Sequence, residues 1–161
     1  MKSVTKLTFI PENSVISNGF GRVDYCDTYC IVKKTDETAG EIAARVLKLP
    51  KWANWLMSIR DAIVRIFRLK TSKEILQEHQ GFPMIAQHEN EFVSGTNDKH
   101  LDYRLSILVD RENTSIYFTT IVHFNNFFGR AYFVPVKPFH KIIVKSILKR
   151  QINEKCKTLE V

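Results

Sequence analysis

The spacing of apolar residues changes twice along this chain, and each change marks a change of secondary structure. Between residues 38 and 67 apolar residues recur at helical spacing, as they do in amphipathic helices. Between residues 84 and 124 they alternate with polar residues in short runs separated by turns, as they do in antiparallel strands. From residue 128 the helical spacing returns. The sequence therefore predicts an α+β protein.

Two short helices are predicted to follow the first strong strand. Residues 23–33 are rich in β-branched and aromatic side chains, which favour a strand. Thr38 and Glu41 have the spacing of a capping box, so they predict the start of a helix that ends at Pro50. A second helix after Pro50 carries an apolar stripe that includes Trp52, Trp55 and Leu56.

The later strands are predicted from alternation and from turn residues. Short connections join them, so neighbouring strands must be antiparallel. A further short strand is expected near residues 7–10, within an irregular lead-in over residues 1–22. The predicted strands after residue 82 are 84–86, 91–94, 100–109 and 115–124.

The last segment supports two interpretations. Pro135 and Pro138 argue against a regular helix, yet the helical spacing of apolar residues continues through them. The preferred interpretation is one long helix from about Gly129 to Glu154, kinked near the prolines. The alternative is a strand over residues 132–136 followed by a helix from Pro138.

The predicted order is a strand, two helices, several antiparallel strands and a long helix. This is the order of the helix-grip fold, in which a curved sheet bends around the last helix and leaves a cavity between them. A ferredoxin-like α+β domain is the main rival. We expect residues 23–157 to form this single domain.

Composition and charge limit the class of protein. With 161 residues, 44% of them apolar, the chain is long enough for one domain with a substantial core. No apolar run approaches the roughly 20 residues of a membrane span, and no signal peptide is recognisable. Cys26 and Cys30 are too far apart on a strand for a disulfide. We therefore expect a cytoplasmic protein.

The net charge of +7 is concentrated in the last quarter of the chain. A basic helix face is most often solvated surface, but it also suits an acidic membrane or a nucleic acid. The sequence lacks the aromatic and basic ladder of RNA-binding sheets, so a nucleic-acid partner is not expected.

A row of polar residues forms the most informative candidate site. Asp98, His100, Asp102 and Arg104 alternate along one predicted strand and therefore share a face. If that face points outward, it is an ordinary solvated surface. If it points into the cavity, the charges must pair, and His100 beside Asp98 or Asp102 could act as a general base.

Other candidate ligand contacts lie on the elements that would enclose a cavity. No nucleophile motif, P-loop or diagnostic metal-ligand spacing is present, so neither a metal nor a cofactor is expected. The remaining ligand-binding candidates are Trp52, Trp55, Leu56, Phe118, Thr120, Phe128, Tyr132, Phe139 and His140.

Five short stretches carry a resemblance to a known family: residues 50–52, 56–61, 98–104, 129–132 and 137–140. They resemble an uncharacterised bacterial family, the domain of unknown function 2867. That family is grouped with the START and Bet v 1-like (SRPBCC) superfamily. The resemblance implies the helix-grip fold and a hydrophobic cavity, and it implies no reaction and no catalytic residues.

The preferred functional hypothesis is a binding module for a small apolar or amphipathic molecule, which would not be an enzyme. One alternative is a cyclase, hydrolase or isomerase that uses His100 with a neighbouring carboxylate. A second alternative is an interaction protein that uses its basic helix. The first two hypotheses differ in whether the polar side chains of the strand over residues 98–106 point into the cavity or into solvent.

Overall fold

The computed structural model describes residues 4–48, 58, 62, 65 and 83–153, and its strands form a six-stranded antiparallel sheet. The strand order across the sheet is β1-β2-β6-β5-β4-β3. In chain order the elements are β1 (Val4–Leu7), β2 (Tyr25–Val32), α1 (Ala39–Val46), β3 (Met84–Gln87), β4 (Glu91–Asn97), β5 (Leu101–Asp110), β6 (Ser115–Phe124) and α4 (Phe127–Asn153).

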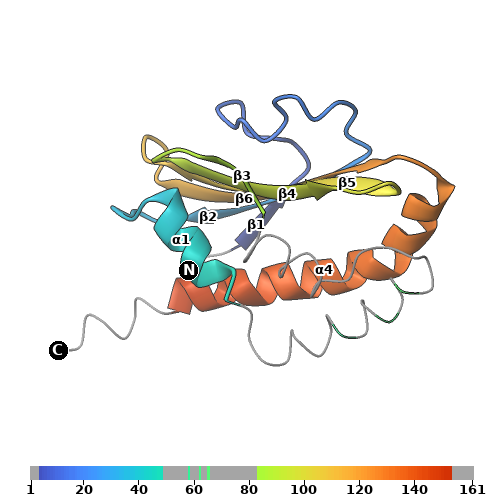
Figure 1. Ribbon diagram of the computed structural model, residues 1–161. Coiled ribbons are helices and arrows are strands. Elements are labelled where there is room, and N and C mark those ends of the chain that lie inside the picture. Colours follow the sequence, from blue (N-terminus) through green and yellow to red (C-terminus); the bar gives the residue numbers. More distant parts are fainter. Residues whose placement is uncertain (1–3, 49–57, 59–61, 63–64, 66–82, 154–161) are drawn as a thin grey trace.

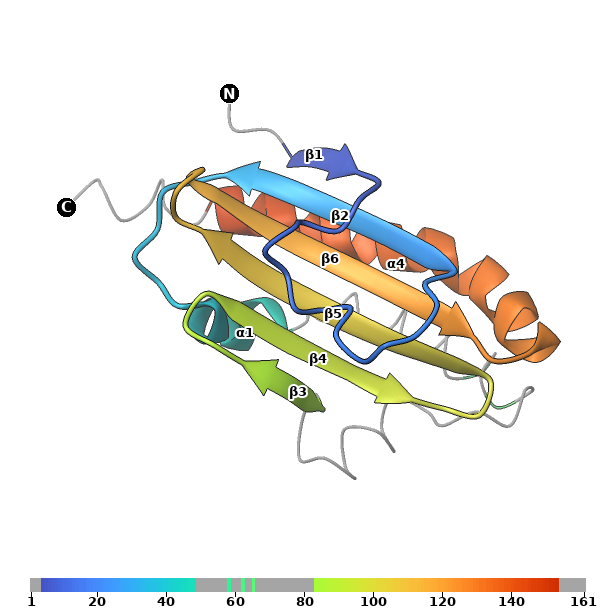
Figure 2. The same cartoon turned by 90° about the horizontal axis from the view of Figure 1, so that it is seen from above.

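The long helix α4 runs along one face of the sheet (Figure 1). Seen from above, β2, β6 and β5 form the centre of the sheet, and α4 lies behind them (Figure 2). The predicted α+β class, the antiparallel sheet and the C-terminal helix are confirmed. This arrangement is compatible with the expected helix-grip fold.

The two prolines lie inside one continuous helix of 27 residues, as the preferred interpretation predicted. The alternative strand over residues 132–136 does not form. Each proline removes a backbone donor from the helix interior, which favours a bend rather than an end. Figure 1 shows that α4 is bent in its N-terminal part. The helix begins at Phe127, two residues before the predicted start at Gly129.

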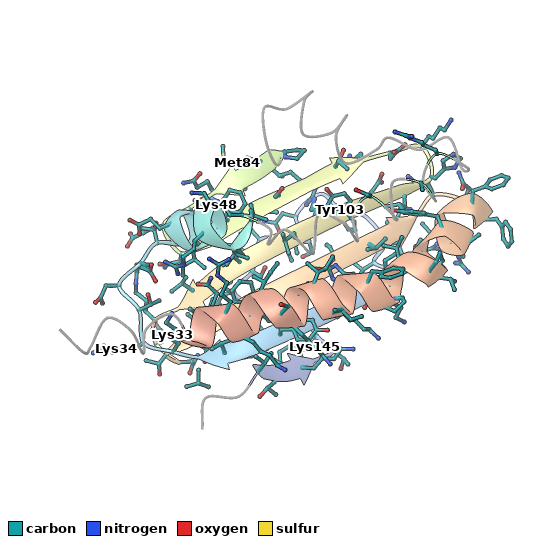
Figure 3. The ribbon with its side chains drawn as sticks, turned by 90° about the horizontal axis from the view of Figure 1, so that it is seen from below. Lys33, Lys34, Lys48, Met84, Tyr103 and Lys145 are labelled. Atoms are coloured by element: carbon teal, nitrogen blue, oxygen red, sulfur yellow. The ribbon has the colours of Figure 1, made fainter. Side chains whose placement is uncertain are left out.

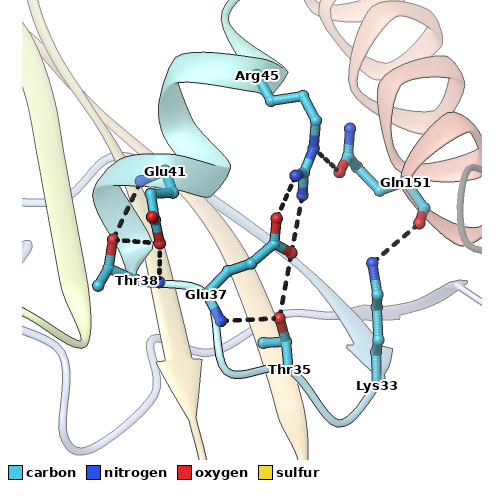
Figure 4. A network of polar contacts seen from close by, with 7 residues as sticks. All are labelled: Lys33, Thr35, Glu37, Thr38, Glu41, Arg45 and Gln151. Carbon is cyan, nitrogen blue, oxygen red and sulfur yellow. Dashed lines mark hydrogen bonds and ion pairs between the residues drawn. The ribbon is translucent and has the colours of Figure 1, made fainter.

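Helix α1 starts with the predicted capping box (Figure 4). The Thr38 hydroxyl accepts from the Glu41 backbone N–H at 3.3 Å, and the Glu41 carboxylate accepts from the Thr38 N–H at 2.8 Å. This reciprocal pair satisfies two donors that the first turn of a helix leaves open. Of the second predicted helix the structure describes only residues 58, 62 and 65, which are helical, and the rest of it lies outside the described residues.

Polar contacts join α1 to the C-terminal part of α4 (Figure 4). Arg45 Nε donates to Gln151 Oε1 at 2.8 Å, and the guanidinium of Arg45 also pairs with Glu37. Lys33 Nζ donates to the backbone carbonyl of Gln151 at 3.2 Å. Gln151 is buried, so these bonds fix the position of the helix end against α1 and β2.

The N-terminal segment, residues 8–24, covers the face of the sheet opposite α4 (Figures 1 and 2). Ile16 and Phe20 pack there against Val93 of β4 and Ile121 of β6. Both faces of the central strands are therefore buried, and the two faces carry separate apolar clusters.

Candidate functional site

Strand β2 places three polar-tipped side chains on the face that α4 covers. Alternate residues of a strand share a face, so Tyr25, Asp27 and Tyr29 point the same way. The Tyr25 ring packs against Phe133 of α4, with ring centres 4.8 Å apart, which fixes the direction of this face. Helix α4 adds His140 from the other side. We call Tyr25, Asp27, Tyr29 and His140 the Asp27 cluster.

Asp27 is the centre of this cluster and is almost fully buried, with 1% of its side chain exposed. The Tyr25 hydroxyl donates to Asp27 Oδ2 at 2.8 Å. The second carboxylate oxygen, Oδ1, lies 3.5 Å from His140 Nε2. That separation is within ion-pair range but is too loose for a well-formed hydrogen bond.

Three buried polar atoms of the cluster have no hydrogen-bond partner among the described residues. They are Asp27 Oδ1, the Tyr29 hydroxyl and His140 Nε2. A buried polar atom left without a partner costs about 1–3 kcal/mol, and more if it is charged. Such groups are rare in native proteins, and each one calls for an explanation such as a functional role or a bound water or ion.

Burial and the neighbouring side chains shift the pKa of Asp27 in opposite directions. Burial tends to raise the pKa of the Asp27 carboxyl, but His140, the Tyr25 hydroxyl and Lys6 together hold it below its ordinary value. The carboxylate is therefore ionised at neutral pH. Burial, with Asp27 nearby, raises the pKa of Tyr29 to about 12, so its hydroxyl remains a donor.

The Asp27 cluster lies where two apolar clusters meet beneath α4. Tyr25 packs with the group around Leu101, Val122 and Tyr132, whereas Tyr29 belongs to the larger core that includes Leu148. Asp27 separates these two tyrosines along β2. A polar centre with apolar surroundings on both sides suits an amphipathic ligand.

Two predicted candidates lie beside the cluster on β6. Thr120 is the cross-strand neighbour of Asp27, and Phe118 is the neighbour of Tyr29. Both are buried, with 8% and 4% of their surfaces exposed. Since paired residues on neighbouring strands share a face, Thr120 and Phe118 also point toward α4.

Asp102 and Arg104, the part of the predicted polar row that lies on β5, are on the face of the sheet opposite α4, whereas Asp98 and His100 precede this strand. Leu101 and Tyr103 pack in the cluster that includes Tyr132 of α4, so the alternating residues Asp102 and Arg104 point away from that helix. Figure 3 shows Tyr103 on the face of the sheet along which α4 lies. Asp102 and Arg104 are therefore outside any space between the sheet and α4.

Arg104 instead anchors the N-terminal segment. Its Nη1 donates to the backbone carbonyls of Ile16 at 2.9 Å and Asn18 at 2.6 Å. Its guanidinium also lies 5.0 Å from the centre of the Phe20 ring. On the same face the buried Glu91 carboxylate accepts from the Val15 N–H at 2.8 Å. Arg104 therefore holds the backbone of the N-terminal segment through Nη1, while its buried Nε has no hydrogen-bond partner among the described residues.

The predicted pairing of His100 with a carboxylate does not form. His100 Nδ1 contacts the Asn126 side-chain amide at 3.0 Å, and its ring lies 5.8 Å from the ring of Phe128. Asp102 Oδ1 accepts from the Asp98 backbone N–H at 3.0 Å. The acidic residues thus shape the β4–β5 turn, and His100 caps the turn before α4.

One family model matches the chain over residues 20–147, and its description is Protein of unknown function (DUF2867). The chain belongs to this family. No curated protein and no solved structure matches it. The DUF2867 match runs from Phe20, in the N-terminal segment, through β6 and most of α4, and it includes every member of the Asp27 cluster.

The remaining predicted residues of this DUF2867 chain occupy different places. Tyr132 is buried and Phe139 is half-buried on α4, whereas Phe128 is 55% exposed at the start of that helix. His140 is the predicted residue that contacts Asp27. Trp52, Trp55 and Leu56 lie outside the described residues.

Sequence reasoning missed Tyr25, Asp27 and Tyr29. The available signal was the single acidic residue in a strand whose other residues are aromatic, β-branched or small. A carboxylate at an inward position of such a strand must be paired, because burial of an unpaired charge is unfavourable. Its partner, His140, is more than a hundred residues away in sequence, so the pairing has no local signature.

Other features of the described residues limit the kinds of site present. Within residues 4–48 and 83–153, no three His, Cys, Asp or Glu side chains gather as a metal ion would require. No helix in the described part of the chain is long and apolar enough to cross a membrane. Two small hollows of about 100 Å³ lie elsewhere, one beside Arg45 and Arg150 and one beside Lys34 and Asp110.

Proposed function

We propose that this DUF2867 protein binds a small apolar or amphipathic molecule between its sheet and α4, in the manner of a helix-grip ligand-binding domain. The observation that carries the proposal is the group of three polar atoms, at Asp27, Tyr29 and His140, that have no hydrogen-bond partner among the described residues. They converge beneath α4, at the junction of two apolar clusters. The proposed ligand places its polar group there and its apolar part along the neighbouring side chains.

The chemistry of the cluster selects the polar group of the ligand. Asp27 Oδ1 accepts a hydrogen bond, and the Tyr29 hydroxyl donates one. A hydroxyl group on the ligand satisfies both, because it can donate to the carboxylate and accept from the tyrosine. A ligand carboxylate is disfavoured, since it would bring a second negative charge beside buried Asp27.

A matched series of ligands tests this selectivity. The full chain is mixed with 1-dodecanol, dodecanoic acid or dodecane, and the melting temperature and the bound mass are measured. We expect the alcohol to raise the melting temperature most, because it alone offers both a donor and an apolar chain without charge. Native mass spectrometry should show one alcohol bound per chain.

Variants of two tyrosines separate binding at the cluster from nonspecific uptake. Tyr29→Phe removes one hydroxyl from the cluster and is expected to weaken alcohol binding by roughly tenfold. Tyr117→Phe is the control, since Tyr117 is on β6 and its side chain points to the face opposite α4. Equal binding of alcohol, acid and alkane, or equal loss in both variants, would contradict the proposal. Binding of water alone at the cluster would show as no thermal shift with any ligand.

The Asp27–His140 pair also supports a second candidate, an acid–base enzyme in the same site. A histidine oriented by a buried carboxylate is a common general base, and the 3.5 Å approach of Nε2 to Oδ1 brings the two together. Turnover of a panel of acyl esters is the measurement. Turnover that His140→Gln abolishes and that exposed His88→Gln retains would favour the enzyme. Absence of turnover by the wild-type chain would favour the binding module.

A further inference from the structure

Helix α4 carries charge of one sign along its whole length. Between Phe127 and Asn153 the sequence has six Lys or Arg residues and no Asp or Glu. Four of these are exposed, namely Arg130, Lys145, Lys149 and Arg150, and Lys145 projects from the helix away from α1 (Figure 3). A single-sign surface of this kind attracts anionic partners.

Apolar side chains are exposed on the same helix. Phe127 is 76% exposed, Phe128 55%, Val134 71% and Ile142 53%. Isolated exposed apolar residues are common on protein surfaces, but four on one helix are unusual beside a buried opposite side. The outward side of α4 therefore combines large apolar groups with cations.

Helical spacing places these two kinds of residue together. Val134 and Lys141 are seven positions apart, and Lys145 and Lys149 follow at intervals of four, so all four share one side of the helix. Val136, His140 and Ile147, which pack toward the sheet, lie on the opposite side. We call Val134, Lys141, Ile142, Lys145 and Lys149 the outer face of α4.

The N-terminal tip of α4 repeats this combination. Phe127 and Phe128 stand beside the β4–β5 turn, where the Asn126 side chain donates to the Lys99 carbonyl at 3.0 Å. Lys99 and Arg130 are both exposed next to the two phenylalanines. Asp98, the acidic residue of this turn, accepts the Lys99 backbone N–H at 2.7 Å.

We propose that the tip and the outer face of α4 dock on an anionic lipid bilayer. The cations are complementary to anionic headgroups, and Phe127, Phe128, Val134 and Ile142 can enter the boundary between headgroups and acyl chains. A nucleic acid would match the charge, but it offers no comparable apolar layer for four exposed hydrophobic side chains. The proposal is independent of what binds beneath α4.

Vesicle sedimentation with the full chain tests the proposal without any variant. Vesicles of phosphatidylcholine alone are compared with vesicles that contain phosphatidylglycerol, at low and moderate salt. We expect binding to the anionic vesicles, weaker binding at higher salt, and little binding to neutral vesicles. Equal binding to both compositions, or none to either, would overturn the proposal.

Matched variants then locate the surface. Lys145→Glu is expected to weaken vesicle binding by roughly tenfold, since it removes one cation and adds one anion. Its control is Arg111→Glu, which makes the same charge change in the exposed β5–β6 turn. Phe127→Ala is expected to weaken binding by roughly fivefold through lost apolar burial. Its control is Phe9→Ala, where the ring is also 56% exposed.

The outcomes separate the lipid surface from its competitors. Loss in Lys145→Glu and Phe127→Ala, with both controls close to wild type, supports the proposed surface. Equal loss in the controls shows a nonspecific effect of charge or hydrophobicity and overturns it. Tight binding to a short DNA duplex that Phe127→Ala leaves unchanged, with no vesicle binding, would assign the basic face to nucleic acid instead.

Discussion

Asp27 and His140 face each other beneath the last helix, with Oδ1 and Nε2 3.5 Å apart. One residue comes from the second strand and the other from the middle of α4, so their approach depends on the packing of the helix against the sheet. Neither atom has a hydrogen-bond partner within the described ranges. This pair is therefore the place where stability and ligand binding are expected to be coupled.

The charge on Asp27 predicts part of the acid sensitivity of the fold. Its pKa in the folded protein is below the ordinary value of 3.8, since His140, Tyr25 and Lys6 outweigh the effect of burial. A lowered folded pKa means that the contribution to stability is present above pH 3.8 and is lost as the pH falls through the folded pKa. Urea unfolding of wild type and Asp27→Asn, from neutral pH downward, measures this contribution.

In that experiment the difference between the two free energies of unfolding should shrink at low pH. Other carboxylates with lowered pKa values, such as Asp24 and Glu37, titrate in both proteins and cancel in the difference. Asp36→Asn, a change of an exposed carboxylate, is the control. A difference between wild type and Asp27→Asn that stays constant with pH would contradict the assigned pKa.

Removal of the hydroxyl group from Tyr25 and from Tyr29 should change the stability of the protein differently. Tyr25 donates to the Asp27 carboxylate at 2.8 Å, so Tyr25→Phe should destabilise the protein by about 1.5–3 kcal/mol. The Tyr29 hydroxyl is buried and has no hydrogen-bond partner in the described part of the chain, so Tyr29→Phe should be neutral or stabilising without ligand. Urea unfolding measures both, and a loss of equal size in Tyr29→Phe would show that this hydroxyl is already satisfied.

Most of the fold was predictable because it depends on local patterns. The limits of β6 match the predicted 115–124, and the Thr38–Glu41 capping box forms as expected. The prolines of α4 were the hardest local feature, since proline disfavours a helix interior while the apolar spacing favours continuity. The structure has one helix, Phe127–Asn153, in agreement with the apolar spacing.

The site was less predictable, because it depends on which face of a strand is covered. Alternation showed that Asp102 and Arg104 share a face, but it could not show that residues 8–24 rather than α4 lie over that face. The irregular N-terminal segment has no period, so its position on the sheet had no signal. The pairing of Asp27 with His140 also has no local signal, because the two residues meet only when α4 packs against the sheet.

The anchoring role of Arg104 predicts that its loss releases the N-terminal segment. Arg104→Met keeps much of the apolar stem but removes the donor to Ile16 and Asn18, and it should destabilise the protein by about 2 kcal/mol. Amide hydrogen exchange should become faster in residues 8–24, where few backbone bonds hold the segment. Arg111→Met, which removes the exposed contacts with Glu89 and Asn90, should cost less than about 1 kcal/mol. Unchanged exchange in residues 8–24 would show that Arg104 does not hold the segment.

Replacement of Gly129 by alanine should destabilise the protein, although alanine has the higher helix propensity. Within a helix, alanine is ordinarily more stable than glycine by about 1 kcal/mol. At this position, however, a Cβ atom would lie 2.1 Å from the backbone carbonyl oxygen of His100, in the β4–β5 turn. Gly129→Ala should therefore destabilise the protein by about 1–3 kcal/mol in thermal or urea unfolding.

The control is Gly40→Ala in α1, where the new Cβ would meet the end of the flexible Gln87 side chain, so little or no loss of stability is expected. If Gly129→Ala were as stable as wild type, the close approach of α4 to the β4–β5 turn would be wrong.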